Sequence, residues 1–208
     1  MPDITLYHID GTRSVRIRWL LEEMGLPYRL AVLTHEDRAG ASYRAIHPFG
    51  RVPALRDGDV ALFESGAIAE YLLQRYDDGT LSPPVDTAEG AQHLSWMHAA
   101  EGTLLNLVAE YSIQTKWLPP ERRSPETAAF AAKRLDPLLT ALEQTLTQRP
   151  YIAGEAFRAA DVMIGHAVYA CGHLELLPQE AVALPAYRDR VTARPAFATA
   201  SAPAGAGH

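Results

Sequence analysis

Three hydroxyl side chains lie close together near the start of the chain, in the stretch LYHIDGTRSVRIRW (6–19). They belong to Tyr7, Thr12 and Ser14, and Arg13 lies between the last two. The pattern predicts a short strand that ends near Tyr7, then a loop and a helix. Such a junction can be a plain helix start with Ser14 as its cap. It can also hold an anion, because hydroxyls, arginine and the first turn of a helix all favour negative charge.

A second candidate site begins in FGRVPAL (49–55), where Val52-Pro53 precedes a stretch typical of a strand. Proline has no N–H to give to a sheet, so it is expected at the start of a strand or at a bulge. A cis bond at Pro53 would leave the backbone N–H and C=O of Val52 able to pair with an extended, peptide-like ligand. On this stretch alone, a proline that simply begins the strand is the favoured interpretation.

Charged and hydroxyl groups follow in FES (63–65), where the next helix is expected to begin. Ser65 is a suitable helix cap, and Glu64 complements the positive end of the helix dipole. The N–H and hydroxyl of Ser65 could also receive a carboxylate, while Glu64 receives an ammonium group. Arg51, at the preceding turn, could bind a second carboxylate. Together these residues predict a small peptide ligand with a zwitterionic head and an acidic tail.

The elements that must position these residues follow from the periodicity of the chain. ITLYH (4–8) is typical of a strand, RSVRIRWLLEEMG of a helix and PYRLAVL (27–33) of a second strand. A polar segment, a hairpin with its turn at Asp57-Gly58-Asp59, and the helix ESGAIAEYLLQRYDD come next. Beyond a segment rich in proline and glycine, the pattern is helical throughout. The predicted helical segments are 88–117, 125–148, 159–175 and 185–193.

These elements predict an α/β domain of order β-α-β-α-β-β-α followed by an all-helical domain. A parallel strand pair needs a crossover such as the first helix, and that crossover should be right-handed. The expected boundaries are 1–78 for the α/β domain, 79–87 for a linker, 88–200 for the helical domain and 201–208 for a disordered tail.

Composition predicts a soluble cytoplasmic protein. The chain has 208 residues, 48% of them hydrophobic, and a formal net charge of −6. The negative charge disfavours nucleic acid as a partner, because binding phosphates needs a basic face. No apolar stretch is long enough to span a membrane, and the first residues do not resemble a signal peptide. The single cysteine, Cys171, fits a reducing compartment.

Other kinds of active site find no support in the motifs. The eight histidines form no HExxH pair, and one cysteine does not build a zinc cluster, so we expect no metal site. Nucleotide-binding and serine-hydrolase motifs are also missing. Cys171 lies in YACGHLELL, far along the sequence from the first loop, and is expected to be a buried helix residue.

Taken together, the motifs resemble those of a cytosolic glutathione transferase, of the bacterial, theta-like serine or threonine type. The resemblance runs from Ile4 to about Phe197 and includes GRVPAL, ESGAIAEYL, the linker and RPYIAGEAFRAADVMIGHAV. It implies a thioredoxin-like N-terminal domain and an all-helical C-terminal domain. One departure is Arg158, three residues before Asp161, where the family has serine or threonine in a capping box. We expect a weaker cap there, with Asp161 still bound to local backbone.

The resemblance also implies roles for the motif residues. Val52 and a cis-Pro53 would bind the cysteinyl backbone of glutathione. Glu64 and Ser65 would bind its γ-glutamyl head, and Arg51 would lie near its glycine carboxylate. His47 stands in HPFGRVP where the family more often has asparagine, and it either bonds to the ligand or only shapes the turn.

A thiolate is the nucleophile in this family, and a free thiol has a pKa of about 8.5. Lowering that pKa by about two units takes roughly 2.7 kcal/mol, which one charge-assisted hydrogen bond of about 1.5–3 kcal/mol can supply. Thr12 replaces the first serine of the SRSxR motif of bacterial members and is the preferred donor. Tyr7 matches the tyrosine of other classes, and Ser14 stays a third option. Arg13 could reinforce the anion, whereas Arg16 and Arg18 are expected on the helix surface or between domains.

The expected activity is conjugation of glutathione to a hydrophobic electrophile, as in detoxification. The electrophile pocket is expected among the first helices after the linker, with Tyr111 and Leu105 as lining candidates; core packing is the alternative for most residues there. The resemblance further implies a homodimer. A non-catalytic glutathione-binding or protein-interaction module stays open, since fold alone prescribes no activity, and so does a glutathione-dependent isomerase or peroxidase.

Overall fold

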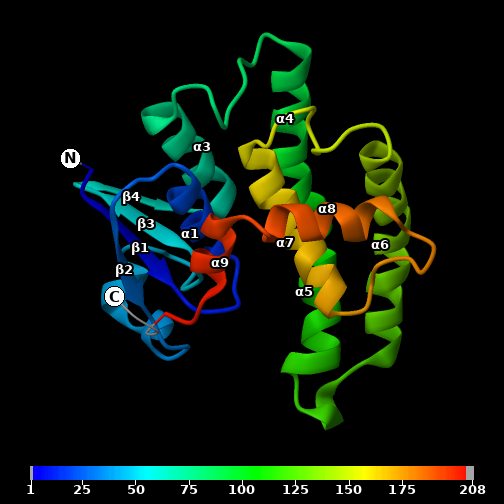
Figure 1. The fold of residues 1–208 in the computed structure, drawn as a ribbon. Helices are drawn as coiled ribbons and strands as arrows, with labels where there is room; N and C mark the ends of the chain where they lie inside the picture. The colour runs from blue at the N-terminus through cyan, green and yellow to red at the C-terminus, as the bar shows by residue number, and fades with distance from the viewer. Residues whose placement is uncertain (1, 205–208) are drawn as a thin grey trace. The chain divides into compact units, whose positions relative to one another are not determined.

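The computed structural model describes residues 2–204, and its contacts divide the chain into two units (Figure 1). One unit contains the residues up to Asp78 together with those from Ala193 onward, and the other runs from Gly79 to Thr192. The expected tail 201–208 falls partly outside the described residues. Within them, no helix is both long enough and apolar enough to cross a membrane.

The first unit is built on a mixed sheet of four strands in the order β2-β1-β3-β4. Strand β1 (Ile4–His8) is parallel to β2 (Tyr28–Val32) and antiparallel to β3 (Ala54–Asp57), which forms a hairpin with β4 (Val60–Phe63). Gly58 has a φ of +57°, which glycine adopts at no steric cost in a two-residue hairpin turn. The predicted strands, hairpin and order of elements are confirmed.

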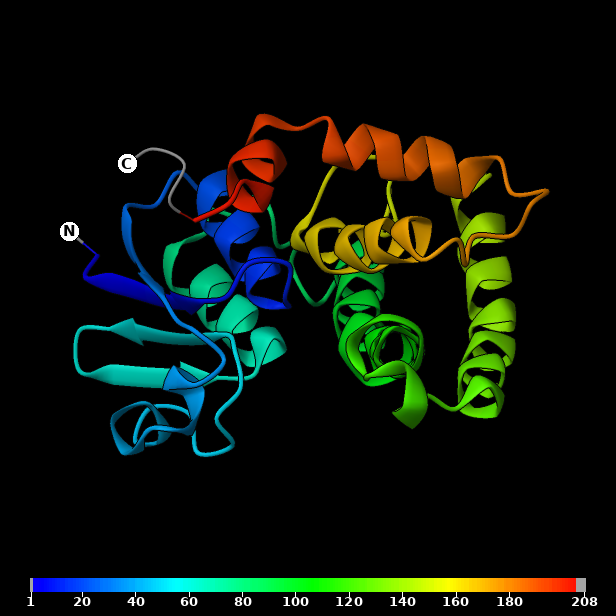
Figure 2. The same cartoon turned by 90° about the horizontal axis from the view of Figure 1, so that it is seen from below.

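Helices α1 (Ser14–Glu23) and α3 (Ser65–Tyr76) contact each other and pack against the strands (Figure 2). A short helix α2 (Ala41–Arg44) lies between β2 and β3. Asp57, at the end of β3, accepts hydrogen bonds from the hydroxyls of Tyr71 and Tyr76 in α3. Burial and this carboxylate raise the pKa of both tyrosines. The bonds fix α3 against the hairpin.

Helix α9 (Pro195–Ser201) belongs to the first unit and packs along α1. The ring of Phe197 lies 4.9 Å from that of Trp19, and Arg194 binds Glu23 through two bonds of 2.6 and 2.7 Å. The predicted division, which placed all residues from 88 to 200 in the helical domain, is therefore wrong at its C-terminal end. The cause is a set of contacts between residues far apart in sequence.

The second unit is helical. Residues 88–117 form one helical run made of α4 (Ala88–Ala99), α5 (Leu105–Ser112) and a π-helical turn after each. Helix α6 (Pro125–Leu146) packs against α5, while α7 (Ala159–His173) packs against α4, α5 and α8 (Ala183–Thr192). The four predicted helical segments are confirmed to within a few residues at their ends.

Helix α7 is the core of this unit, with nearly all of its first ten residues buried. Asp161 accepts hydrogen bonds of 2.8 Å from the backbone N–H groups of Arg158 and Ile152 and one of 2.9 Å from the buried Tyr187 hydroxyl. The expectation that Asp161 binds local backbone is confirmed. The Arg158 guanidinium extends away from this cap and donates to Glu89. The residues 79–87, expected as a linker, are tied to this unit, since the carbonyl of Leu81 accepts from the N–H of Ala159.

Candidate functional site

Three motifs meet at one end of the sheet, and the strand register explains why. Tyr7, near the end of β1, is paired with Ala54 at the start of β3, and Ala54 is paired with Phe63 at the end of β4. The loop after Tyr7, the Val52-Pro53 turn before Ala54 and the Glu64-Ser65 step after Phe63 must therefore leave the sheet side by side. These three segments, which are far apart in the sequence, therefore come together at one end of the sheet.

Ser14 is buried and faces inward. Its hydroxyl accepts from the backbone N–H of Ile9 at 3.2 Å and lies 2.8 Å from Nδ1 of His8. The residue at the helix cap is Arg13, whose side chain makes no capping hydrogen bond, and the N–H of Ser14 donates to Oγ1 of Thr12. The expected capping role of Ser14 is therefore wrong, because its hydroxyl is engaged by the preceding strand and loop. A fully buried hydroxyl is also poorly placed to touch a ligand.

Thr12 is partly exposed, and its Oγ1 lies 2.8 Å from Oγ of Ser14 and 2.7 Å from the carbonyl oxygen of Ile9. It is the one side chain of the hydroxyl pair that reaches the surface. Tyr7 is also partly exposed, and its ring lies 5.6 Å from that of Tyr43. The geometry therefore leaves Thr12 and Tyr7 as the two hydroxyls open to a ligand.

His8, the last residue of β1, and Asp10, in the loop that follows, form a pair that the sequence motifs did not indicate. His8 is 0% exposed, and its Nε2 lies 2.9 Å from Oδ1 of Asp10. Burial lowers the pKa of His8, while Asp10 acts in the opposite direction. The alternation of buried residues along β1 could have indicated this, since Ile4, Leu6 and His8 share one face.

The Val52-Pro53 bond is cis, as the resemblance implies. Pro53 is buried, Val52 is partly exposed and the Arg51 side chain is exposed. The Arg51 carbonyl accepts a hydrogen bond from the hydroxyl of Tyr43. His47 is buried, its Nδ1 accepts from the N–H of Phe49 at 3.3 Å, and burial lowers its pKa. Of the two roles expected for His47, shaping the turn is the one these contacts support.

Glu64 has φ 69° and ψ 116°, a backbone conformation that side chains other than glycine rarely adopt. Its side chain is exposed, and it occupies the cap position of α3 without a capping hydrogen bond. Ser65 is the first residue of the helix and does not cap it, contrary to expectation. The strained backbone turns Glu64 outward directly before the first N–H groups of α3, an arrangement suited to binding an amino acid head group.

Arg16 is fully buried and donates from Nη2 to Oγ of Ser65 at 2.8 Å. This bond holds the hydroxyl of Ser65 at the start of α3. Arg18 is 3% exposed and donates to the carbonyls of Ala200 and Ala202. The predicted helix-surface position of both arginines is wrong, because both side chains are buried and bind Ser65 or the carbonyls of Ala200 and Ala202.

In the second unit, Tyr111 lines a cavity of about 530 Å³. Leu105 does not line it, since its side chain is 4% exposed and packs within the helices. The other residues around the cavity come from the turn after α5 and from α6: Gln114, Thr115, Arg123, Pro125, Ala128, Ala129 and Ala132. The role of Tyr111 and Leu105 in an electrophile pocket stays a prediction.

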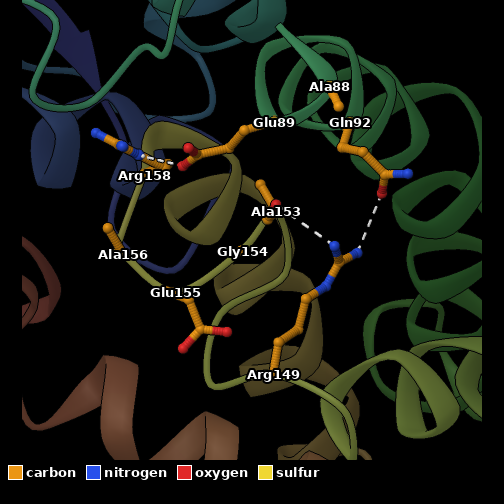
Figure 3. A pocket seen from close by; sticks show the side chains of 9 residues that line it. All are labelled: Ala88, Glu89, Gln92, Arg149, Ala153, Gly154, Glu155, Ala156 and Arg158. Carbon is orange, nitrogen blue, oxygen red and sulfur yellow. Dashed lines mark hydrogen bonds and ion pairs between the residues drawn. The ribbon is translucent and has the colours of Figure 1, made fainter.

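A second cavity of about 570 Å³ is lined in part by charged and polar side chains, among them two pairs that bind each other (Figure 3). Arg158 donates to Glu89 at 2.9 Å, and Arg149 donates to Gln92 at 3.1 Å. These bonds join α4 to the segment before α7 and are structural. Elsewhere in the second unit, Cys171 is buried, and burial raises its pKa to about 12, which makes it a poor nucleophile. Among residues 2–204, no three histidine, cysteine, aspartate or glutamate side chains are grouped to hold a metal ion.

Comparison with known proteins agrees with this geometry. The family model for the glutathione S-transferase N-terminal domain matches residues 2–74. Glutathione S-transferase 3 of Zea mays is 32% identical over 201 residues, which cover 94% of this chain and 86% of the relative. Glutathione S-transferase GstB of Escherichia coli strain K12 is 29% identical over 205 residues, 93% of this chain and 95% of the relative.

A solved structure gives the same result for the fold. The theta class glutathione S-transferase of Xanthomonas axonopodis pv. citri, solved with glutathione bound, superposes with a TM-score of 0.84. The match covers 97% of this chain and 98% of that one at 28% identity. The expected fold, a thioredoxin-like domain followed by a helical domain, is confirmed.

Proposed function

Because the chain belongs to the glutathione S-transferase family, we propose that it is an enzyme that conjugates glutathione to a hydrophobic electrophile. The observation that carries this proposal is the convergence of Thr12, the cis Val52-Pro53 turn and the Glu64-Ser65 step at one end of the sheet. Each group suits a different part of the same small peptide. A serine or threonine type of bacterial origin fits this set.

The backbone of Val52 would pair with the cysteinyl residue of glutathione, as in an added strand. Glu64 would bind the ammonium group of the γ-glutamyl head, and Ser65 would bind its carboxylate. The bond from Arg16 to Ser65 supports this assignment, since it holds the serine hydroxyl in place at the start of α3. Arg51, which is exposed, would attract the glycine carboxylate. Arg13 would add positive charge near the sulfur.

Thr12 is the proposed donor to the thiolate. It is partly exposed, whereas Ser14 is buried behind it. One hydrogen bond to the anion, worth about 1.5–3 kcal/mol, would lower the thiol pKa by about one to two units. Tyr7 is the alternative donor, because it is partly exposed and lies near the end of β1, just before the loop that contains Thr12. Tyr111 is proposed to contribute to the electrophile pocket. A homodimer acting in cytoplasmic detoxification completes the proposal.

The test is a titration of glutathione against the protein, followed by the ultraviolet absorbance of the thiolate and by turnover of a general aryl halide. We expect the thiolate band to appear below the pH at which free glutathione ionises, and we expect the aryl halide to be conjugated. Binding with neither a shifted pKa nor turnover would instead mark a non-catalytic module. Turnover only of peroxides or of isomerisable substrates would replace the transferase with a related activity.

A further inference from the structure

We propose that the buried His8, paired with the exposed Asp10, receives the proton of the bound thiol by way of the hydroxyls of Ser14 and Thr12. The inference deepens the proposed function, on which it rests. Four groups form one line of contacts: Thr12 Oγ1 to Ser14 Oγ at 2.8 Å, Ser14 Oγ to His8 Nδ1 at 2.8 Å, and His8 Nε2 to Asp10 Oδ1 at 2.9 Å. Each distance is that of a good hydrogen bond.

The direction of donation along this line of hydrogen bonds follows from the group at its far end, Asp10. The Asp10 carboxylate only accepts hydrogen bonds, so Nε2 of neutral His8 carries the ring hydrogen and Nδ1 is an acceptor. Ser14 then donates to Nδ1, and its oxygen accepts from the N–H of Ile9 and is free to accept from Thr12, whose hydroxyl has the Ile9 carbonyl as a second acceptor at 2.7 Å. With neutral His8, the hydrogens point inward. The oxygen of Thr12 accepts from the N–H of Ser14 at 3.3 Å and keeps a second lone pair for the proposed thiol.

The transfer moves one proton and no electrons between groups. The S–H bond breaks and its proton goes to Thr12 Oγ1, the hydrogen of Thr12 moves to Ser14 Oγ, and that of Ser14 moves to His8 Nδ1. The products are a thiolate and an imidazolium beside the Asp10 carboxylate. Every hydrogen in the chain now points outward, so the hydroxyl of Thr12 donates to the sulfur anion. After conjugation the proton can return by the same path to the leaving group or to water.

The surroundings of His8 lower its pKa on balance and so favour the neutral ring, but they also place a counter-ion beside it. Burial and the more distant Arg18 favour the neutral ring, whereas the adjacent Asp10 favours the charged one, and these are the charged groups of the described residues that act on it. Asp10 is held in place by the backbone N–H of Ala204, which lies 3.1 Å from each of its carboxylate oxygens. His8 is therefore neutral before the thiol binds, with a counter-ion in position. Its role is that of a positioning residue, because it reaches the sulfur only through Ser14 and Thr12.

The charge of the His8 ring is the direct test, measured by nitrogen NMR of the imidazole at neutral pH. We expect His8 to become protonated when glutathione binds, and to stay neutral with S-methylglutathione, which has no thiol proton. A pH indicator in weak buffer should show much less than one proton released for each thiolate formed. In Thr12→Val, which breaks the chain, His8 should stay neutral with either ligand.

Asp10→Asn supplies a second readout without touching the thiol. Removing the counter-ion should raise the pKa of the bound thiol by about one unit. Asp3→Asn is the matched control, since Asp3 is an exposed carboxylate near the other end of β1 that pairs with Arg29, and it should change nothing.

A thiolate that forms with neutral His8, one released proton and no effect of Asp10→Asn would overturn the relay while leaving the transferase intact. Failure to bind glutathione, or to form a thiolate, would instead overturn the proposed function together with the relay.

Discussion

Thr12 and Ser14 are two residues apart, yet their surroundings differ in a way that matters for chemistry. Ser14 is buried against His8 and Ile9, whereas Thr12 reaches the surface. The sequence correctly singled out the hydroxyl cluster, since residue types at a strand–helix junction are visible in any sequence. It did not distinguish which hydroxyl is buried, because that depends on how the loop folds back onto β1. The burial of His8, by contrast, could have been predicted, since His8 shares one face of β1 with Ile4 and Leu6.

Replacing Thr12 should mainly affect catalysis, whereas replacing Ser14 should clearly lower the stability of the fold. Thr12→Val should raise the pKa of the bound thiol and lower kcat at neutral pH by about 10- to 100-fold, the equivalent of one charge-assisted hydrogen bond, with little loss of stability. Ser14→Ala should cost about 1–3 kcal/mol of unfolding free energy, since the N–H of Ile9 and Nδ1 of His8 would lose their partner. Thiol titration and urea denaturation measure the two effects. Equal kcat in wild type and Thr12→Val would remove Thr12 from the mechanism.

Arg16 and Arg18 provide a matched pair on one helix. Arg16→Gln should raise the KM for glutathione by about tenfold, because a charge-assisted bond orients Ser65. Arg18→Gln should leave KM unchanged and lower the urea midpoint, since Arg18 binds the carbonyls of Ala200 and Ala202. Steady-state kinetics at varied glutathione, alongside denaturation curves, separate the two. A KM effect of Arg18→Gln equal to that of Arg16→Gln would argue against a specific role for Arg16.

At the scale of elements, the sequence predicted nearly every helix and strand. Strand β1 matches its prediction at both ends, and the long helical run 88–117 is continuous. Periodicity carries this information, because burial of one face imposes a repeat. The exception is α9, whose sequence PAFATAS has small residues and little amphipathic pattern. Helix α9 is stabilised by packing of the Phe197 ring against Trp19, a contact between distant residues that no local sequence pattern predicts.

The start of α8 offers an element-scale prediction. Glu143 in α6 accepts from the backbone N–H groups of Val182, Ala183 and Leu184 at 2.9, 2.8 and 2.7 Å. Burial raises the pKa of Glu143, but these three bonds outweigh it, so the net pKa is lowered below its ordinary 4.5. Glu143→Gln should therefore cost about 1–2 kcal/mol at neutral pH.

The pH dependence of that cost follows from the lowered pKa. The stabilisation is fully present above the unfolded pKa of 4.5 and is lost as pH falls through the lower folded value. Urea denaturation at several pH values should show the difference between wild type and Glu143→Gln shrinking in that acidic range. Glu121→Gln, at an exposed position, is the control and should have little effect at any pH. A constant difference down to the lowest pH would contradict the role of the charge.

At the scale of the whole molecule, the chain returns to its first unit after the helical one. Arg194, Phe197 and the carbonyls near Ala200 bind residues of α1, some 170 to 180 positions earlier. The N–H of Ala204 then reaches Asp10, in the loop that precedes α1. The sequence resemblance extended to about Phe197 and thus covered this segment, but it did not assign the segment to the α/β unit. The end of the chain is therefore part of the framework of the candidate site.

Phe197→Ala should destabilise the protein by about 3 kcal/mol, since the ring is 5% exposed and packs on Trp19. Phe130→Ala is the matched control, because that ring is 62% exposed and its loss should cost less than about 0.5 kcal/mol. Thermal and urea denaturation give both values. Equal effects of the two substitutions would mean that α9 adds no more to stability than an exposed side chain does.

The central claim is that glutathione lies at the end of the sheet with its sulfur facing the loop after β1. A crystal structure of the protein with glutathione bound tests it most directly, through the distances from the sulfur to the hydroxyl oxygens of Thr12 and Tyr7. The account predicts a sulfur within about 3.5 Å of Thr12 Oγ1, which is hydrogen-bond range. A sulfur more than about 4 Å from Thr12 and closer to Tyr7, or a ligand bound elsewhere, would contradict it.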